Sequence, residues 1–197
     1  MSGANLANAD ISGCDLVGSS LSGAKLEGAN LSGANLEGCD LSGANIRSAN
    51  LTGVNLKGAN LEGADLLYVR LLGSDLSGAN LRNANLAVAQ VAGCDLRGAD
   101  LAGASIRQIE ADTADFSGAQ MSGVDAFGAS FVAATLKGAK LSGAMLSKAD
   151  LNAADLRDAD LSGAEMINTN LRAADMRGAN LGGATMTGAS TNLAKME

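Results

Sequence analysis

Large apolar residues recur along the chain with a period of five residues. Leu, Ile, Val, Met or Phe occupies nearly every fifth position from Leu6 to Met186, and only Ala111 and Ala126 depart from this within that span. We call this the centre position. No insertion or deletion interrupts the phase. The chain is therefore organised by a short repeat, which has to be interpreted before any single element.

The segment Ala29–Gly38 shows the repeating unit twice. We name its five positions small, polar, centre, first turn and second turn. The small position holds Ala, Ser, Cys or Thr in all repeats but four, which have Val54, Val69, Ile109 and Val124. The second turn position holds 25 of the 26 glycines.

A helix does not fit this period. Five residues advance about 500° around a helix of 3.6 residues per turn, which would spread the centres over all sides. A short extended segment does fit, because residues two apart point to the same face, so the small and centre side chains both face inward. Five is odd, however, and a straight strand would turn the next pair outward. The chain has to turn once per repeat, and glycine at the second turn position supplies the positive φ of a type II turn.

The motif A(D/N)LxG, repeated over essentially all of residues 1–197, resembles the pentapeptide-repeat proteins. The resemblance implies an all-β fold: a right-handed quadrilateral β-helix, or solenoid, with four pentapeptides per coil and about ten coils. It also implies that residues i and i+20 stack, in a rod of roughly 45–50 Å at a strand spacing of ~4.8 Å. We expect residues 1–197 to form a single domain, stabilised by each coil and its neighbours rather than by one globular core.

The charge and the cysteines limit the partners and the compartment. The net charge of −7 argues against direct binding to nucleic acid and against binding to an anionic membrane. No apolar run approaches the length of a membrane span, and no secretory signal is visible. Cys14, Cys39 and Cys94 all occupy small positions, where Cys serves as a small hydrophobic residue. We expect free thiols, and a location in the cytoplasm or another reducing compartment.

The residue types that carry most enzyme chemistry are scarce. The chain has no His, no Trp and one Tyr. No Ser or Cys has a nearby base, and no phosphate-binding loop precedes a helix. With neither His nor a CxxC pattern, a zinc site is not expected either. We expect no catalytic residues, no cofactor and no metal.

An irregular stretch places large apolar side chains on the outside of the predicted coil. Leu67, Tyr68 and Leu72 occupy turn positions around one corner, and Val88 stacks on Tyr68. Farther along the same side lie four more apolar residues, Phe127, Val132, Met145 and Ile167. A contiguous exposed apolar strip is typical of an interaction surface, and Tyr and Phe are typical anchor residues. The alternative is that these are scattered surface residues without a function.

One segment exchanges large and small residues. Ile109 is large at a small position, and the next centre, Ala111, is small; Val124 and Ala126 repeat the exchange. The total volume is nearly conserved, which close-packed interiors tolerate. Ala111 would also leave room for Phe131, which stacks above it. We interpret the exchange as repacking of the core, with a local bulge as the alternative.

One side of the predicted coil carries a ladder of acidic residues. Asp75, Asp95 and Asp115 would stack one strand spacing apart, which is unfavourable without a counter-charge. A row of basic residues at the neighbouring turn is one source of that charge, and a bound cation or a basic group of a partner is another. Elsewhere, stacked pairs such as Asn35 with Asn55 are expected to hydrogen-bond between coils.

Two functions fit these features. The first is a non-catalytic scaffold that binds a protein partner, or a second copy of itself, through the apolar corner and the two ends. Both ends would expose apolar rims and open strand edges, to be covered by another copy, by a partner or by the last residues folded back as a plug.

The second function is an alternative that the family resemblance implies. Some pentapeptide-repeat proteins resemble a DNA duplex and bind DNA gyrase or topoisomerase, either inhibiting it or protecting it from drugs. Those members typically have Phe at many centres, an interrupting loop and a C-terminal dimerisation helix. This chain has Phe at only two centres, Phe116 and Phe131, which weakens the DNA-mimic interpretation.

Overall fold

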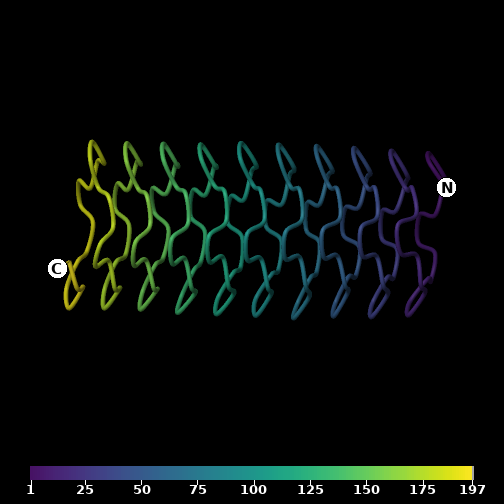
Figure 1. Cartoon of the computed structure of the whole chain (residues 1–197), viewed down its shortest axis with the longest axis horizontal. Helices are drawn as coiled ribbons and strands as arrows, with labels where there is room; N and C mark the ends of the chain where they lie inside the picture. Colours follow the sequence, from purple (N-terminus) through teal and green to yellow (C-terminus); the bar gives the residue numbers. More distant parts are fainter. Residues whose placement is uncertain (197) are drawn as a thin grey trace.

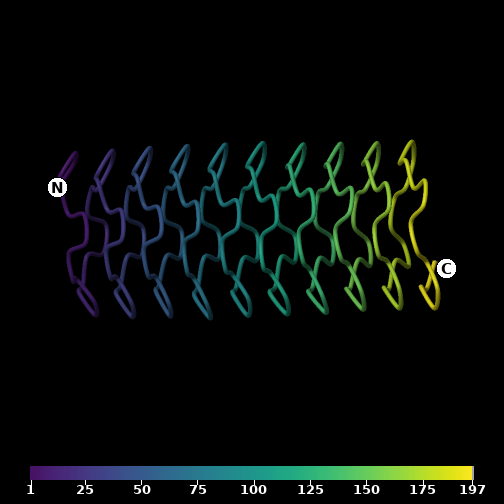
Figure 2. The ribbon, with the colours of Figure 1, turned by 180° about the vertical axis from the view of Figure 1, so that it is seen from behind.

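A computed structural model describes residues 1–196. The chain winds into a rod of stacked coils, with its two termini at opposite ends (Figure 1, Figure 2). Every coil has the same outline, and the sequence runs along the rod without returning (Figure 1). Long-range structure is therefore built only from contacts between successive coils, as in other repeat proteins.

Successive coils are joined by parallel bridges at the polar position. Each bridge pairs residue i with residue i+20, from Asn5–Lys25 to Asp175–Lys195. This is the stacking that the family resemblance implies. Each bridge is a single residue, and residues 1–196 contain neither a helix nor a run of paired residues long enough to be a strand. The extended part of each repeat is limited to its small, polar and centre residues because a two-residue turn follows every centre.

Four backbone N–H groups of each repeat have a regular acceptor. The polar N–H donates to the small-position carbonyl of the preceding coil. The centre and second-turn N–H groups donate to the following coil, and the small-position N–H closes the turn onto the centre carbonyl. In the repeat around Leu61, these four N···O distances are 2.8, 2.7, 2.9 and 3.0 Å in that order. The fifth N–H, at the first turn position, has no regular backbone acceptor. Whether a side chain accepts its hydrogen bond differs from one part of the surface to another.

Every second turn position is left-handed, with φ between 53° and 74°. Glycine adopts this conformation without strain, as the sequence predicted. Fourteen other residues adopt it as well, including Tyr68, Val88 and Thr113. A β-branched residue in this region is strained, so the stacking of the coils imposes the turn even where the residue opposes it.

The interior is filled by the small and centre side chains. Nearly all of them between Leu21 and Met176 are fully buried, whereas those of the first and last coils are partly exposed. The bridges continue without a shift through the segment that exchanges Ile109 with Ala111. The exchange is therefore a repacking and not a bulge. Phe131 packs edge-on against Phe116, with ring centroids 5.6 Å apart.

The last described residues continue the repeat. Lys195 pairs with Asp175, and residues 192–193 form a turn like those before it. Residues up to Met196 therefore do not fold back as a plug over the end; Glu197 lies outside the described residues. Over residues 1–196, no helix is long and apolar enough to cross a membrane.

Candidate protein-binding surface

The side chain at the polar position completes the hydrogen bonding of its own repeat. Wherever this position holds Asn or Asp, its Oδ1 accepts a hydrogen bond from the first-turn N–H two residues later, at 2.8–3.4 Å. Short polar side chains commonly satisfy backbone groups in this way. The Asn or Asp of the motif therefore caps the first-turn N–H, the one backbone donor of the repeat that has no regular backbone acceptor.

The asparagines also connect the coils. Asn55 Nδ2 donates to Asn35 Oδ1 at 2.9 Å, and Asn80 Nδ2 donates to Asn60 Oδ1 at 3.0 Å. The predicted bonds between stacked asparagines are thus present. In each such pair the amide donates toward the preceding coil. An Asp stacked on an Asp has no such donor and needs a cation instead.

The predicted acidic ladder obtains its counter-charge from within the chain. Arg97 Nε donates to both carboxylate oxygens of Asp95, at 2.8 and 3.0 Å, and lies 4.0 Å from Asp115. The bonded guanidinium lowers the pKa of Asp95 below its usual range. Arg157 and Arg177 make the same fork with Asp155 and Asp175 and lower the pKa of each carboxyl.

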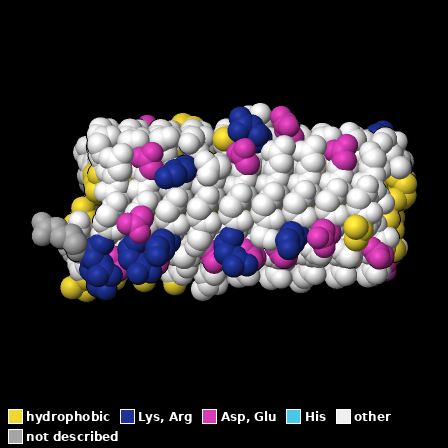
Figure 3. All heavy atoms as spheres, viewed as in Figure 1, with side chains coloured by type: hydrophobic (Ala, Val, Ile, Leu, Met, Phe, Trp, Pro, Cys, Tyr) yellow, Lys and Arg dark blue, Asp and Glu magenta, His cyan; other side chains and the backbone are white. Residues whose placement is uncertain are grey.

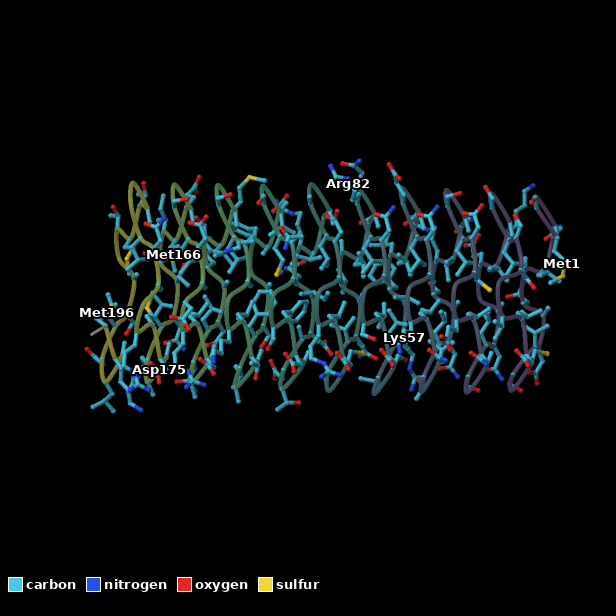
Figure 4. All side chains as sticks on the ribbon, viewed as in Figure 1. Met1, Lys57, Arg82, Met166, Asp175 and Met196 are labelled. Carbon is cyan, nitrogen blue, oxygen red and sulfur yellow. The ribbon has the colours of Figure 1, made fainter. Side chains whose placement is uncertain are left out.

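The ladder is therefore an alternation of acids and bases, visible along one edge of the rod in Figure 3. Asp75 and Asp115 each accept a bond from the N–H of the serine two residues later. In Figure 4, Lys57 and Asp175 lie on this side and Arg82 on the opposite one. Within residues 1–196, no group of three acidic, Cys or His side chains is arranged to hold a metal ion.

The residues of the predicted apolar strip all lie outside the core, but they differ in exposure. Tyr68 and Met145 are exposed, at 53% and 43%. The other predicted residues are half-buried: Leu67, Leu72, Val88, Phe127, Val132 and Ile167. Their role in binding stays a prediction.

The strip is not continuous. Phe127 lies between two cations, with the Arg107 guanidinium 4.8 Å and the Lys148 ammonium 5.4 Å from its ring centroid. Its faces are thus already in contact with charged groups, an arrangement that favours the ring where it is. Met145 occupies a polar position, on the line that joins Asp125 to Glu165. Neither residue continues the surface around Tyr68.

That surface spans two turns. Leu67 and Tyr68 form one turn, Leu72 belongs to the next, and the exposed Arg70 lies between them and pairs with Gln90 of the following coil. Val88 is one coil farther along, over Tyr68. We refer to Leu67, Tyr68, Leu72 and Val88 as the Tyr68 surface.

Beside the Tyr68 surface, the caps of the first-turn N–H groups are missing. The polar positions of three successive coils hold Arg70, Gln90 and Glu110, whose side chains accept no bond from the N–H groups of the turns that follow them. Those three N–H groups, of Leu72, Ala92 and Asp112, have no acceptor among residues 1–196. Uncapped first-turn N–H groups also occur at other turns, such as those of Glu27 and Ser142, but among the described residues only these three follow one another over three successive coils. Sequence reasoning missed this feature, although the loss of Asn and Asp from three stacked polar positions is visible in the sequence.

Away from the two ends of the rod, where Met1, Leu193 and Met196 are exposed, one further exposed apolar residue was also missed. Val17 is 54% exposed at a first turn position, although the regular sequence around it gave no reason to single it out. No pocket opens anywhere in residues 1–196.

The comparisons with known proteins agree on one family. The family model for pentapeptide repeats matches in eight copies, over residues 1–38, 19–58, 55–89, 94–131, 114–152 and 154–190. No curated protein matches the chain. Among solved structures, HetL from the cyanobacterium Nostoc sp. strain PCC 7120, a pentapeptide repeat protein involved in heterocyst differentiation regulation, is 31% identical. The match covers 98% of this chain and 87% of HetL, with a TM-score of 0.62.

QnrB1, a plasmid-mediated fluoroquinolone resistance protein, is more distant. The full-length structure is 21% identical with a TM-score of 0.58, and the match covers 93% of this chain and 94% of QnrB1. A trypsin-treated variant is 24% identical with a TM-score of 0.57, covering 90% of this chain and 91% of that one. These two likenesses concern the fold alone. The repeat pattern, the stacked coils and the family match together place the chain in the pentapeptide-repeat family, as a right-handed β-helix.

Proposed function

We propose that this protein is a non-catalytic scaffold that binds a protein partner through the Tyr68 surface. The observation that carries the proposal is the exposure of Tyr68, the chain's one tyrosine, at 53%, flanked by half-buried Leu67, Leu72 and Val88. Aromatic residues with partly buried apolar neighbours are typical anchors of protein interfaces. Buried free thiols at Cys39 and Cys94 favour a reducing compartment.

A finer description of the fold belongs to the same proposal. We take the coil to be quadrilateral, with four pentapeptides per coil and about ten coils. The pairing of each polar residue with the one twenty positions later supports this description.

The test is the capture of a partner from the native source by the wild-type protein and by the Leu67→Asp/Tyr68→Ser double variant, with light scattering on both. We expect the double variant to lose the partner, or the dimer, while its circular dichroism spectrum stays unchanged. Val17→Asp is the matched control, because Val17 is as exposed as Tyr68 but belongs to another stack of turns. Capture that survives in the double variant would reject the Tyr68 surface.

The DNA-mimic alternative has a separate test. It requires a sustained negative surface, whereas Arg97 neutralises the middle of the ladder formed by Asp75, Asp95 and Asp115. On the scaffold proposal, micromolar protein leaves the supercoiling activity of DNA gyrase unchanged. Inhibition that disappears when the three aspartates are changed to Asn would favour the alternative.

A further inference from the structure

We propose that the Tyr68 surface takes an acidic segment of a partner protein, in which a carboxylate lies between large apolar side chains. The inference rests on the proposed function and adds the chemistry of the partner. Three independent features of the surface lead to it: uncapped backbone donors, an unpaired cation and flanking apolar side chains.

The first feature is the set of uncapped donors. In the regular repeats, an Asn or Asp oxygen accepts the first-turn N–H, as Asn50 does for Thr52 at 3.3 Å. One coil farther along the same stack, Arg70 offers no acceptor, and the N–H of Leu72 is left open. The N–H groups of Ala92 and Asp112 continue the series over the next two coils. Because a carboxylate oxygen fills this place elsewhere on the rod, a carboxylate from another molecule is the group that fits it here.

The second feature is the charge of Arg70. Six of the eight arginines form ion pairs within 4.0 Å. Arg70 and Arg172 have none among residues 1–196. Arg70 is exposed and lies along the chain between two turns that carry apolar residues, so its guanidinium is accessible to an incoming anion. A guanidinium and a backbone N–H together form a charge-assisted donor set that suits a carboxylate.

The third feature is the apolar flank. Leu67 and Tyr68 precede Arg70 along the chain, Leu72 follows it, and Val88 lies one coil away. A partner segment whose carboxylate reaches Arg70 and the Leu72 N–H therefore brings its neighbouring side chains onto these residues. Apolar burial then adds to an ion pair that would be weak alone at an exposed site.

The surroundings favour a singly charged group over a phosphate. Glu110 occupies the same line of polar positions two coils beyond Arg70, and Asp112 the corresponding turn. Asp112 is engaged with Ser130 and Val132 and carries its own negative charge beside the third open N–H. At the same place, a dianion would be repelled by both carboxylates about twice as strongly as a single carboxylate.

The decisive variant is Arg70→Asn, which restores the repeat motif. Asn at this position would accept the Leu72 N–H and donate to Asn50, as the other stacked asparagines do. We expect the variant to be at least as stable as the wild type and to bind at least tenfold more weakly. A residue with a merely structural role would not show this combination. Arg172→Asn is the matched control, because it removes the other unpaired arginine while the Arg172 N–H is already capped by Asn170 at 3.2 Å.

The probe is a displayed library of random twelve-residue peptides, selected on the full chain. We expect enriched sequences with Asp or Glu between large apolar residues. They should bind the Arg172→Asn rod within twofold of wild type, and they should shift the amide resonances of Leu72 and Ala92. Changing the acidic residue of a selected peptide to Asn should abolish binding, and changing it to phosphoserine should weaken it.

Several outcomes would overturn the inference. Enriched peptides without a carboxylate, equal affinity for the Arg70→Asn rod, or no enrichment at all would each reject it. Peptides lost on the Leu67→Asp/Tyr68→Ser rod but retained on Arg70→Asn would reject the acidic partner and leave the proposed function intact. The capture of a native partner by the wild-type protein, compared with the Leu67→Asp/Tyr68→Ser variant, tests the proposed function and not the chemistry of the partner.

Discussion

At the scale of single residues, the Asn or Asp of each repeat has two tasks. Its oxygen caps the first-turn N–H of its own repeat, and an Asn amide additionally joins the coil to the preceding one. Asn60 shows both: it accepts from the Glu62 N–H at 3.3 Å and from Asn80 at 3.0 Å, and it donates to Asp40 at 3.1 Å. The two tasks can be separated by substitution.

Asn60→Asp keeps the acceptor and removes only the donor, so it also stacks a carboxylate on Asp40. We expect a loss of about 1 kcal/mol in the free energy of unfolding, part of which returns in high salt. Asn60→Ala removes all three bonds and should cost about 2 kcal/mol, independently of salt. Urea unfolding at low and high salt measures both. Equal losses with equal salt dependence would contradict the separation.

At the left-handed second turn position, a substitution is expected to raise the free energy of unfolding instead of lowering it. Thr113 is exposed there with φ of 60°, which strains a β-branched residue. Thr113→Gly should therefore raise the free energy of unfolding by about 1 kcal/mol. Gly93→Thr, at the equivalent position one coil earlier with nothing within 4 Å of the added Cβ, should lower it by a similar amount. Thermal unfolding of both variants and of the wild type tests the pair.

At the scale of the element, the unit is one coil packed on its neighbours. The exchange of Ile109 and Ala111 shows that a coil conserves its volume even when single positions do not follow the motif. Phe131 lies above Ala111, and both are fully buried. The space that a centre leaves empty is thus used by the centre stacked on it.

Ala111→Leu restores the motif locally but overfills this space. We expect it to destabilise the protein by about 1–3 kcal/mol, the usual cost of overpacking. Adding Phe131→Leu should recover most of the loss, because a Leu stacked on a Leu is the regular arrangement elsewhere. Chemical unfolding of the single and double variants measures the coupling. A double variant less stable than Ala111→Leu alone would show that the two positions do not share the space.

At the scale of the whole molecule, one turn per repeat follows from the sequence because an odd period with glycine at a fixed place leaves one way to keep apolar residues inside. The stacking of residue i on residue i+20 came from the family resemblance, and the bridges have this register. The Tyr68 surface could be located in the same way. The uncapped N–H groups of this surface were not predicted, because the motif alone does not show that the Asn or Asp side chain is the acceptor of the first-turn N–H. The cations around Phe127 were missed because the repeat predicts which residues stack but not the direction in which the long side chains of Arg107 and Lys148 extend.

The acid stability of the rod is also a property of the whole molecule. Hydrogen bonds from Arg177 hold the pKa of Asp175 down to about 2, below its ordinary value of about 3.9. Because the folded pKa is the lower one, the ionised carboxylate stabilises the fold above about pH 4, and this contribution is lost as the pH falls toward 2. Asp95 and Asp155 are lowered in the same direction by Arg97 and Arg157.

We expect the free energy of unfolding to fall as the pH drops from about 4 to 2. The difference between wild type and Asp175→Asn should be present at pH 7 and vanish near pH 2. Urea unfolding at pH 7, 4 and 2 checks this, with Asp75→Asn as the control because Asp75 forms no ion pair within residues 1–196. A difference that persists at pH 2 would contradict the assignment.

The irregular coil around Phe131 has a consequence for how the chain reaches its native winding. In residues 21–65 every side of the coil presents nearly the same residues, so a coil closed one pentapeptide early or late would still place Leu on Leu and small on small. Such mistakes have little energetic penalty in the regular part. Phe131 lies above the small centre Ala111, and a winding error of five residues would place it over Ile106 or Phe116 instead. The departures from the motif therefore favour one stacking register in a sequence whose regular repeats are compatible with several.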